Sequence, residues 1–218
     1  MQLYIWRHPK PKQVQGLCFG QSEVAVDRRK LKRLAHQIQR FVRLNQLPKQ
    51  IWVSPLQRSK QVGEYLAAQG FECYVDDQLL ETHFGVWEGK PWSQISKEDI
   101  DNWCDNFADF APTGGESLRQ LFQRVAAWIE QQKQLQAELN NHKFGNNDNS
   151  KSNNNSKSNN NSENNDKAEN SNNKTVLVVG HAGWINTAKL IHQGQSVPAK
   201  AIHWPAALRH GELTQLQF

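Results

Sequence analysis

Apolar positions along the chain form two alternating patterns, short continuous runs and stripes at helical spacing. Runs of strand length occupy residues 3–6 (LYIW), 51–54 (IWVS), 71–75 (FECYV) and 175–179 (TVLVV). A stripe after the first run predicts an amphipathic helix whose basic residues face solvent. This stripe consists of Leu31, Leu34, Ala35, Ile38, Phe41 and Val42.

Local signals predict two further helices and one more strand. Ser54 and Pro55 suit the N-cap and the first turn of a helix after the second run. Residues 180–193 continue the strand at 175–179 as a helix, and residues 212–218 (ELTQLQF) alternate as an edge strand does. Strands that alternate with helices predict an α/β protein, a three-layer α/β/α sandwich with a mostly parallel central sheet.

One segment lacks any pattern from which a core could form. Residues 140–174 contain 16 asparagines among 35 residues, and the hexamer SKSNNN occurs twice in tandem. Such a segment cannot bury enough apolar surface to offset the entropy of ordering it. We therefore expect a single domain made of residues 1–139 and 175–218, interrupted by a disordered, asparagine-rich insertion.

The formal net charge of +5 is concentrated in residues 27–40 (DRRKLKRLAHQIQR). We interpret these basic residues as a solvated helix face, because no aromatic stacking residues alternate with them, and we expect no nucleic-acid partner. Nucleic-acid binding through residues 28–43 stays open as an alternative, and it predicts an affinity that falls steeply with salt.

Cysteine usage and hydropathy favour a cytoplasmic protein. Cys18, Cys73 and Cys104 are widely spaced and form no Cys-x-x-Cys pair, which fits reduced thiols. No apolar run approaches the ~20 residues of a membrane span, and no signal-like segment is present. We expect no membrane association.

Cationic and imidazole side chains follow three of the predicted strands. Arg7 and His8 follow the first strand, Arg58 lies in the turn after the second, and His181 follows the strand at 175–179. The carboxyl ends of parallel strands meet at one edge of a sheet, so we expect these side chains to converge. Two guanidinium groups and a helix N-terminus predict an anion site, with phosphate as the expected ligand.

A histidine held against a phosphate can also attack phosphorus. The ring nitrogen then forms a phosphoenzyme, while cations neutralise charge on the equatorial oxygens. The leaving alkoxide needs a proton donor, and the segment LLETHFGVWEG offers Glu81 and Glu88. Each element is weak alone, so their combination carries the hypothesis.

Five motifs, in order, resemble those of the histidine phosphatase superfamily, which has a phosphoglycerate mutase-like fold: IWRHPKP, VSPLQRSKQV, LLETHFGVWEG, PTGGES and VLVVGHAGW. The resemblance implies that His8 is the nucleophile, that Arg7, Arg58 and His181 form the phosphate pocket, and that Glu81 is the proton donor. It implies that neither a metal nor another cofactor is required. Glu88 is then structural.

Within the superfamily, the segment GLCFGQSE looks most like the α-ribazole phosphatase branch, which acts late in cobalamin nucleotide-loop assembly. The expected substrate is a small phosphate monoester, α-ribazole 5′-phosphate. The resemblance places Gln21, Ala182, Glu116 and Ser117 in the substrate pocket. For Glu116 and Ser117, capping of the following helix is an equal alternative.

One departure from the family pattern, and one literal match to it elsewhere in the chain, bear on function. Pro9 stands where the family has glycine, which removes a backbone N–H and fixes φ. The string Arg209-His210-Gly211 matches the family's Arg-His-Gly literally, but it follows no strong strand, so we interpret Gly211 as a turn residue. Pro9 motivates one alternative, a binding protein for phosphate ligands that has lost turnover.

Two further alternatives remain. Phosphoglycerate mutase activity would transfer the phosphoryl group between positions instead of releasing it to water. The segment 86–111 also carries four aromatic residues that could hold a ring of the substrate or belong to the core. They are Trp92, Trp103, Phe107 and Phe110.

Overall fold

The computed structural model describes residues 1–145 and 175–218 and contains a five-stranded sheet. The strand order is β3-β2-β4-β1-β5, and only the edge strand β5 is antiparallel to its neighbour. The predicted strands, including the closing edge strand, are confirmed. Their bounds are Gln2–Arg7 for β1, Gln50–Val53 for β2, Glu72–Val75 for β3, Thr175–Gly180 for β4 and Leu213–Gln217 for β5.

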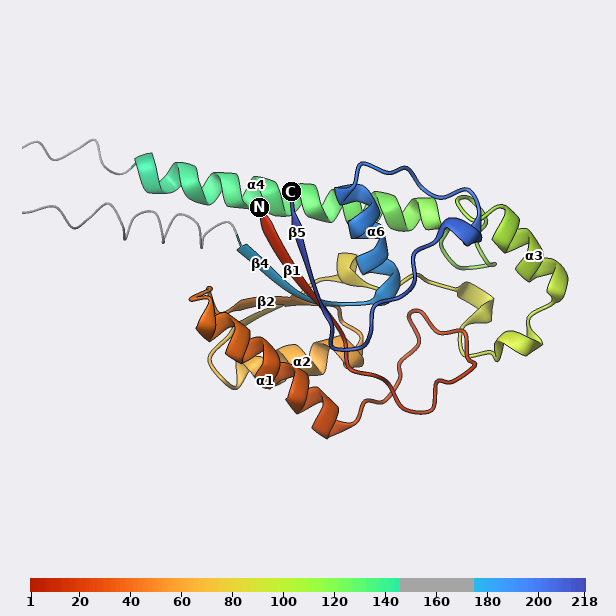
Figure 1. Ribbon diagram of the computed structural model, residues 1–218, viewed down its shortest axis with the longest axis horizontal. Coiled ribbons are helices and arrows are strands. Elements are labelled where there is room, and N and C mark those ends of the chain that lie inside the picture. Colours follow the sequence, from red (N-terminus) through yellow and green to blue (C-terminus); the bar gives the residue numbers. More distant parts are fainter. Residues whose placement is uncertain (146–174) are drawn as a thin grey trace, which may run out of the picture.

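Helices cover both faces of this sheet, as Figure 1 shows. α1 (Arg28–Leu44) and α2 (Gln57–Ala67) lie on one face, and α4 (Leu118–Gly145) and α6 (Ala182–His192) lie on the other. The predicted three-layer α/β/α architecture with a mostly parallel sheet is therefore confirmed.

Alternation along the central strands supplies a separate core to each layer. Leu3, Ile5 and Val178 are fully buried beneath α4 and α6, whereas Trp6 and Val179 point to the opposite face and pack with α1 and α2. Because these strands are covered on both faces, their interior positions, 3–6 in β1 and 176–179 in β4, are continuous apolar runs.

The predicted amphipathic helix is α1. Its apolar stripe is buried against the sheet, with Phe41 contacting the rings of Tyr4 and Trp6. The carboxylate of Asp27 caps the helix by accepting from the backbone N–H of Arg29 at 2.8 Å. The basic residues lie outside this stripe, so they take no part in the core.

The expected cap of the second helix is wrong. α2 begins at Gln57, its N-cap is Leu56, and no side chain caps it. Ser54 lies earlier, where β2 has just ended, and its hydroxyl is used elsewhere. Pro55 continues the turn between the strand and the helix.

The helix α4 extends to Gly145, beyond residue 139 where we placed the end of the first ordered segment. The end of α4 and the start of β4 lie at the same end of the molecule in Figure 1. Residues 146–174 lie outside the described residues, and the disordered insertion stays a prediction. Among the described helices, none combines the length and the apolar character needed to cross a membrane.

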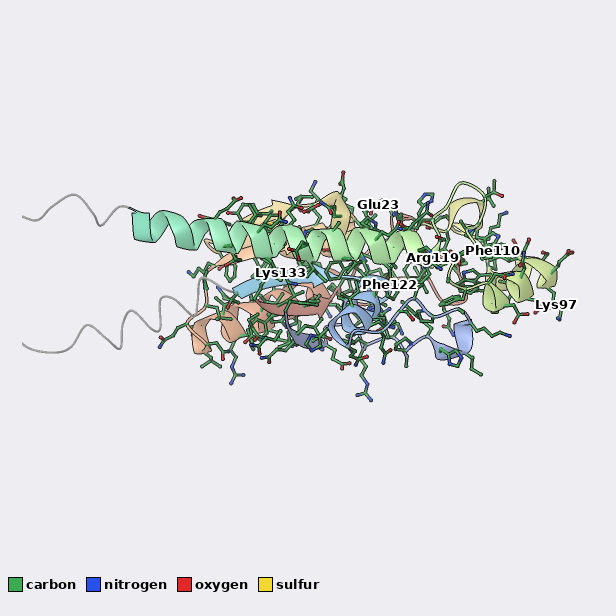
Figure 2. The ribbon with its side chains drawn as sticks, turned by 90° about the horizontal axis from the view of Figure 1, so that it is seen from above. Glu23, Lys97, Phe110, Arg119, Phe122 and Lys133 are labelled. Atoms are coloured by element: carbon green, nitrogen blue, oxygen red, sulfur yellow. The ribbon has the colours of Figure 1, made fainter. Side chains whose placement is uncertain are left out.

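Residues 84–112 form an extension at the end of the molecule where α4 begins. The segment contains the 3-10 helices η2 (Gly85–Trp87) and η3 (Trp92–Gln94) and the helix α3 (Lys97–Asp105). Figure 2 shows Lys97 and Phe110 at this end, near Arg119 in the first turn of α4.

Replacement of Gly63 tests the packing of α2 on the sheet. A Cβ at this position would lie 2.4 Å from the Sγ of Cys73 and 2.9 Å from a methyl group of Val53. We expect Gly63→Ala to lower the free energy of unfolding by about 1–3 kcal/mol, because overpacking outweighs the gain in helix propensity. Urea titration measures this change. In a Cys73→Ala background the loss should shrink, and a Gly63→Ala protein as stable as the wild type would contradict the packing.

Candidate active site

The pairing of β1 with β4 brings two histidines together. Arg7 is the partner of Gly180 in the parallel register, and the N–H of His8 donates to the Gly180 carbonyl at 3.0 Å. His8 and His181 then follow their strands side by side, with ring centroids 5.0 Å apart. Their exposed fractions are 2% and 0%. The strand-end prediction is confirmed for this pair.

The first turn of α2 adds Arg58 to the same place. Its side chain is 1% exposed, and its guanidinium donates to the carbonyls of Ser22, at 2.9 Å, and Gly20. The group also lies over the ring of Phe19, with 5.6 Å between the guanidinium carbon and the ring centroid. The buried Nε of Arg58 has no hydrogen-bond partner among the described residues, and the same holds for Nε of Arg7.

A hydrogen bond fixes the tautomer of His8, and the surroundings of the ring fix its charge. Its Nδ1 lies 2.8 Å from the Pro9 carbonyl, which can only accept, so Nδ1 carries the hydrogen. Burial and the charge of Arg58 lower the pKa of His8 well below its ordinary value, which leaves the ring neutral. The lone pair of a neutral ring in this tautomer is on Nε2, the nitrogen that a nucleophile requires.

His181 is held by a residue that sequence reasoning assigned to another role. The hydroxyl of Ser54 lies 2.6 Å from Nε2 of His181, whereas Nδ1 of His181 is buried without a partner in the described part of the chain. Ser54 follows β2 as His8 follows β1, so the strand-end rule could have found it. Burial and Arg58 also lower the pKa of His181 well below its ordinary value.

The carboxylate of Glu81 faces the N-terminus of α6. It accepts from the backbone N–H of Gly183 at 2.9 Å and of Trp184 at 3.3 Å. A Cβ on residue 183 would lie 2.4 Å from Glu81 Oε1, so glycine permits this approach. Burial lowers the pKa values of Arg7 and Arg58, and the negative charge of Glu81 partly opposes this shift for both groups.

Glu88 has the structural role that we expected. Its carboxylate accepts from the backbone N–H groups of Gly20, Gln21, Ser22 and Phe84, and from the Ser22 hydroxyl. Although burial alone raises the pKa of Glu88, these hydrogen bonds bring it below its ordinary value. The carboxylate therefore ties the turn after Phe19 to residues 79–89, the loop that carries Glu81, which we call the acid loop.

Gln21 belongs to that tied turn. Its side-chain amide donates to the backbone carbonyl of Glu81 at 2.9 Å and so supports the acid loop. A contact with substrate stays a prediction for Gln21, and likewise for Ala182, which starts α6 between His181 and Gly183.

Glu116 and Ser117 divide between the two roles that we left open. The Ser117 hydroxyl accepts from the Gln120 N–H at 3.3 Å and the Gln120 side chain accepts from the Ser117 N–H at 2.8 Å, which is a capping box at the start of α4. Glu116 instead binds Arg124 at 2.6 Å and the N–H of His83 at 3.0 Å, and it lines a cavity beside Glu81.

The cavity, of about 180 Å³, is largely aromatic. It is lined by Phe19, Glu81, Thr82, Phe84, Trp103, Phe107, Glu116, Leu118, Gly183 and Trp204. Of the four aromatic residues noted in the extension, Trp103 and Phe107 therefore face this cavity. Phe110 stacks on Trp87 and Trp92 stacks on Trp103, so these two belong to the supporting packing.

A third imidazole reaches the site from the string that we set aside. The ring of His210 lies 5.2 Å from that of His8, centroid to centroid. Gly211, with φ +79°, is the expected turn residue. Sequence reasoning missed His210 because the preceding residues form no strand. No local signal could have found it, because its place beside His8 depends on the antiparallel pairing of β5 with β1.

Comparison with known proteins agrees with this geometry. The sequence profile of the histidine phosphatase superfamily (branch 1) matches residues 3–143. The chain belongs to this superfamily. The match ends before β4, so the placement of His181 rests on the structure.

Curated relatives match only part of the chain. The bifunctional protein Rv2228c of Mycobacterium tuberculosis is 36% identical over 76 residues, which are 33% of this chain and 21% of that protein. Phosphoserine phosphatase 1 of Hydrogenobacter thermophilus is 28% identical over 85 residues, 37% of this chain and 40% of that protein. The matches thus span less than half of these relatives.

Solved structures share the fold over nearly the whole chain. Mycobacterial glucosyl-3-phosphoglycerate phosphatase Rv2419c superposes with a TM-score of 0.68 at 22% identity, covering 98% of this chain and 88% of that one. The alpha-ribazole phosphatase from Shigella flexneri gives 0.63 at 19% identity, covering 99% and 89%.

The buried neutral histidines predict how stability depends on pH. Their folded pKa values lie below the unfolded value of 6.5, so the unfolded chain takes up protons that the folded chain does not. The free energy of unfolding should therefore fall as pH drops below about 6.5, by up to about 1.4 kcal/mol per pH unit for each imidazole.

Urea titrations in phosphate-free buffer between about pH 7 and about pH 5 measure this slope. His181→Asn should reduce it, whereas the same change at the exposed His36 provides the matched control. Equal slopes for His181→Asn and the wild type would refute the assignment.

Proposed function

We propose that the chain hydrolyses phosphate monoesters through a phosphohistidine formed at Nε2 of His8. The observation that carries the proposal is the buried, neutral His8, whose Nδ1–H is held by the Pro9 carbonyl beside Arg7 and Arg58. A neutral nucleophile next to two cations suits attack on a dianionic ester.

The reaction has two displacements at phosphorus. In the first, Nε2 of His8 forms a bond to phosphorus, the ester P–O bond breaks, and Glu81 in its acid form protonates the leaving alkoxide. In the second, water attacks phosphorus while the Glu81 carboxylate takes its proton, and the N–P bond breaks to release phosphate. In this mechanism Arg7, Arg58 and Nδ1 of His181 bind the equatorial oxygens.

Pro9 is compatible with turnover, which argues against a protein that only binds its ligand. The residue lacks an N–H, yet its carbonyl holds His8 in the nucleophilic tautomer. Proline at position 9 is therefore consistent with the arrangement that the mechanism needs, in which the nucleophile, the proton donor and the cations lie close together.

For the substrate, we propose an ester whose alcohol carries an aromatic ring, with α-ribazole 5′-phosphate as the specific candidate. The aromatic cavity adjoins Glu81, where the leaving oxygen must lie. Its volume of about 180 Å³ exceeds the roughly 150 Å³ of an apolar cavity that holds benzene. This role would place the protein in cobalamin nucleotide-loop assembly.

The same lining disfavours phosphoglycerate, and with it mutase activity. Phosphoglycerate carries a carboxylate on the leaving-group side. The cavity presents the carboxyl groups of Glu81 and Glu116 and no lysine or arginine among its lining residues. An anionic leaving group would have no cationic partner there.

Trapping of the phosphoenzyme tests the mechanism. Rapid quenching with a ³²P-labelled ester should label the wild type through an acid-labile, base-stable bond. It should also label the control variant His36→Ala, at an exposed position, but not His8→Ala.

A comparison of leaving groups tests the proton donor. Glu81→Gln should lower kcat about 10²–10⁴-fold for alkyl phosphates and much less for 4-nitrophenyl phosphate, whose leaving group needs no proton. Label on His8→Ala would contradict the nucleophile, and equal losses for both esters would contradict the acid.

A panel of esters tests the leaving group. Free-phosphate release should give a higher kcat/KM for α-ribazole 5′-phosphate than for 3-phosphoglycerate or glycerol phosphate. Trp103→Ala should lower kcat/KM about tenfold for the aromatic ester alone, on the order of one lost aromatic contact. Tyr74→Ala, an exposed aromatic on β3, is the matched control. Preference for phosphoglycerate would overturn the proposed substrate class.

A further inference from the structure

The turn that carries His210 is attached to the end of β1 by backbone hydrogen bonds. The N–H of Gly211 donates to the Arg7 carbonyl at 2.9 Å, and the N–H of Arg7 donates to the Glu212 carbonyl at 3.1 Å. The turn closes on itself through Arg209, whose N–H donates to the Glu212 carboxylate at 2.8 Å. None of these bonds uses the imidazole of His210.

That imidazole makes its hydrogen bond to the nucleophile's own peptide. Nδ1 of His210 lies 3.1 Å from the carbonyl oxygen of His8, and a carbonyl can only accept, so Nδ1 of His210 carries the hydrogen. The ring is half-buried beside His8. Burial and the charge of Arg7 lower the pKa of His210 to about 4, with Lys10 and Lys30 adding to the effect. The ring is therefore neutral near pH 7.

The peptide between His8 and Pro9 has a single hydrogen-bonding group. Because residue 9 is proline, this peptide lacks an N–H, and the His8 carbonyl is its only polar anchor. That carbonyl is the one to which His210 donates. The next carbonyl, that of Pro9, accepts from Nδ1 of His8. The proline ring fixes φ of residue 9, so ψ of Pro9 is the one soft torsion between the two carbonyls.

We propose that His210 is a positioning residue that acts together with Pro9 to orient the nucleophile. Its Nδ1–H fixes the plane of the His8–Pro9 peptide. The fixed peptide aims the Pro9 carbonyl at Nδ1 of His8, and this contact keeps the lone pair of His8 on Nε2. The inference rests on the proposed function, because it concerns the same nucleophile. It assigns a role to Pro9, which replaces the family glycine, and to His210, which the sequence analysis set aside.

Substitutions at 210 separate a hydrogen-bond donor from a space-filling ring. In His210→Asn the amide nitrogen takes nearly the position of Nδ1, so the donor is kept. In His210→Phe the ring is kept and the donor is lost. We expect His210→Phe to lower kcat and the rate of phosphoenzyme formation about 10–100-fold at nearly constant KM, as for other groups that orient a reactive side chain. His210→Asn should recover most of the loss.

The tautomer of His8 provides a readout that a purely structural role would not change. Nitrogen-15 NMR of histidine-labelled protein should show His8 protonated at Nδ1 in the wild type and in His210→Asn, and a mixture of tautomers in His210→Phe. His36→Phe, at an exposed position, is the matched control. Thermal unfolding of each variant shows whether the fold is kept.

Three outcomes separate the inference from the proposed function. A His210→Phe protein with wild-type kcat and an unchanged His8 tautomer overturns the inference. Failure of the wild type to form a phosphoenzyme overturns the proposed function, while the NMR spectra still test whether His210 orients His8. Equal losses in His210→Asn and His210→Phe also overturn the inference, because the donor would then be irrelevant.

Discussion

The parallel register between β1 and β4 is the constraint on which the site depends. Arg7 pairs with Gly180, so β1 and β4 end at the same level of the sheet, and His8 lies beside His181. A slip of one residue would turn each side chain to the opposite face and separate the pair. The pairing of Val53 with Val179 extends the same level to β2 and brings Ser54 to His181.

Burial then sets the chemistry of the groups that meet at this edge. Arg7 and Arg58 keep their charges in a largely desolvated place, and the nearest compensating carboxylate of the site, Glu81, is also the proposed proton donor. The imidazoles respond differently, because a histidine can lose its charge at modest cost. The result is two fixed cations next to neutral rings, an arrangement that favours a phosphate dianion and a nucleophilic nitrogen together.

The carboxylates of the site lie on loops outside the sheet, and these loops need contacts of their own to hold them in place. Glu88 ties the turn after Phe19 to the acid loop through backbone N–H groups, and Glu116 ties the same loop to Arg124 on α4. Both carboxylates belong to motifs of the family, so the sequence alone does not separate them from catalytic residues. Their partners are backbone N–H groups, the Ser22 hydroxyl and a half-buried arginine, Arg124, and these contacts hold the loop that carries Glu81, the proposed proton donor.

Local patterns in the sequence are enough to predict the strands, α1 and the three strand ends. Hydrophobic period is a local property, so the strands and α1 were predicted from their own residues, and Arg7, His8, Arg58 and His181 followed from the rule that parallel strands end at one edge. The pattern left Glu81 and Glu88 as equal candidates for the proton donor, and the family resemblance separated them. The pattern also did not place the start of α2, because Ser54 satisfied every local criterion for a cap.

Contacts between segments far apart in the chain depend on the tertiary fold. His210 meets His8 because an edge strand about 200 residues later pairs antiparallel with β1, and no local pattern encodes that pairing. Ser54 bonds His181, not its own helix, for a similar reason, since a hydroxyl takes the partner that folding brings to it. A hydrogen bond depends on the distance and orientation of two groups in the folded protein, whereas the sequence shows only which donors and acceptors are present.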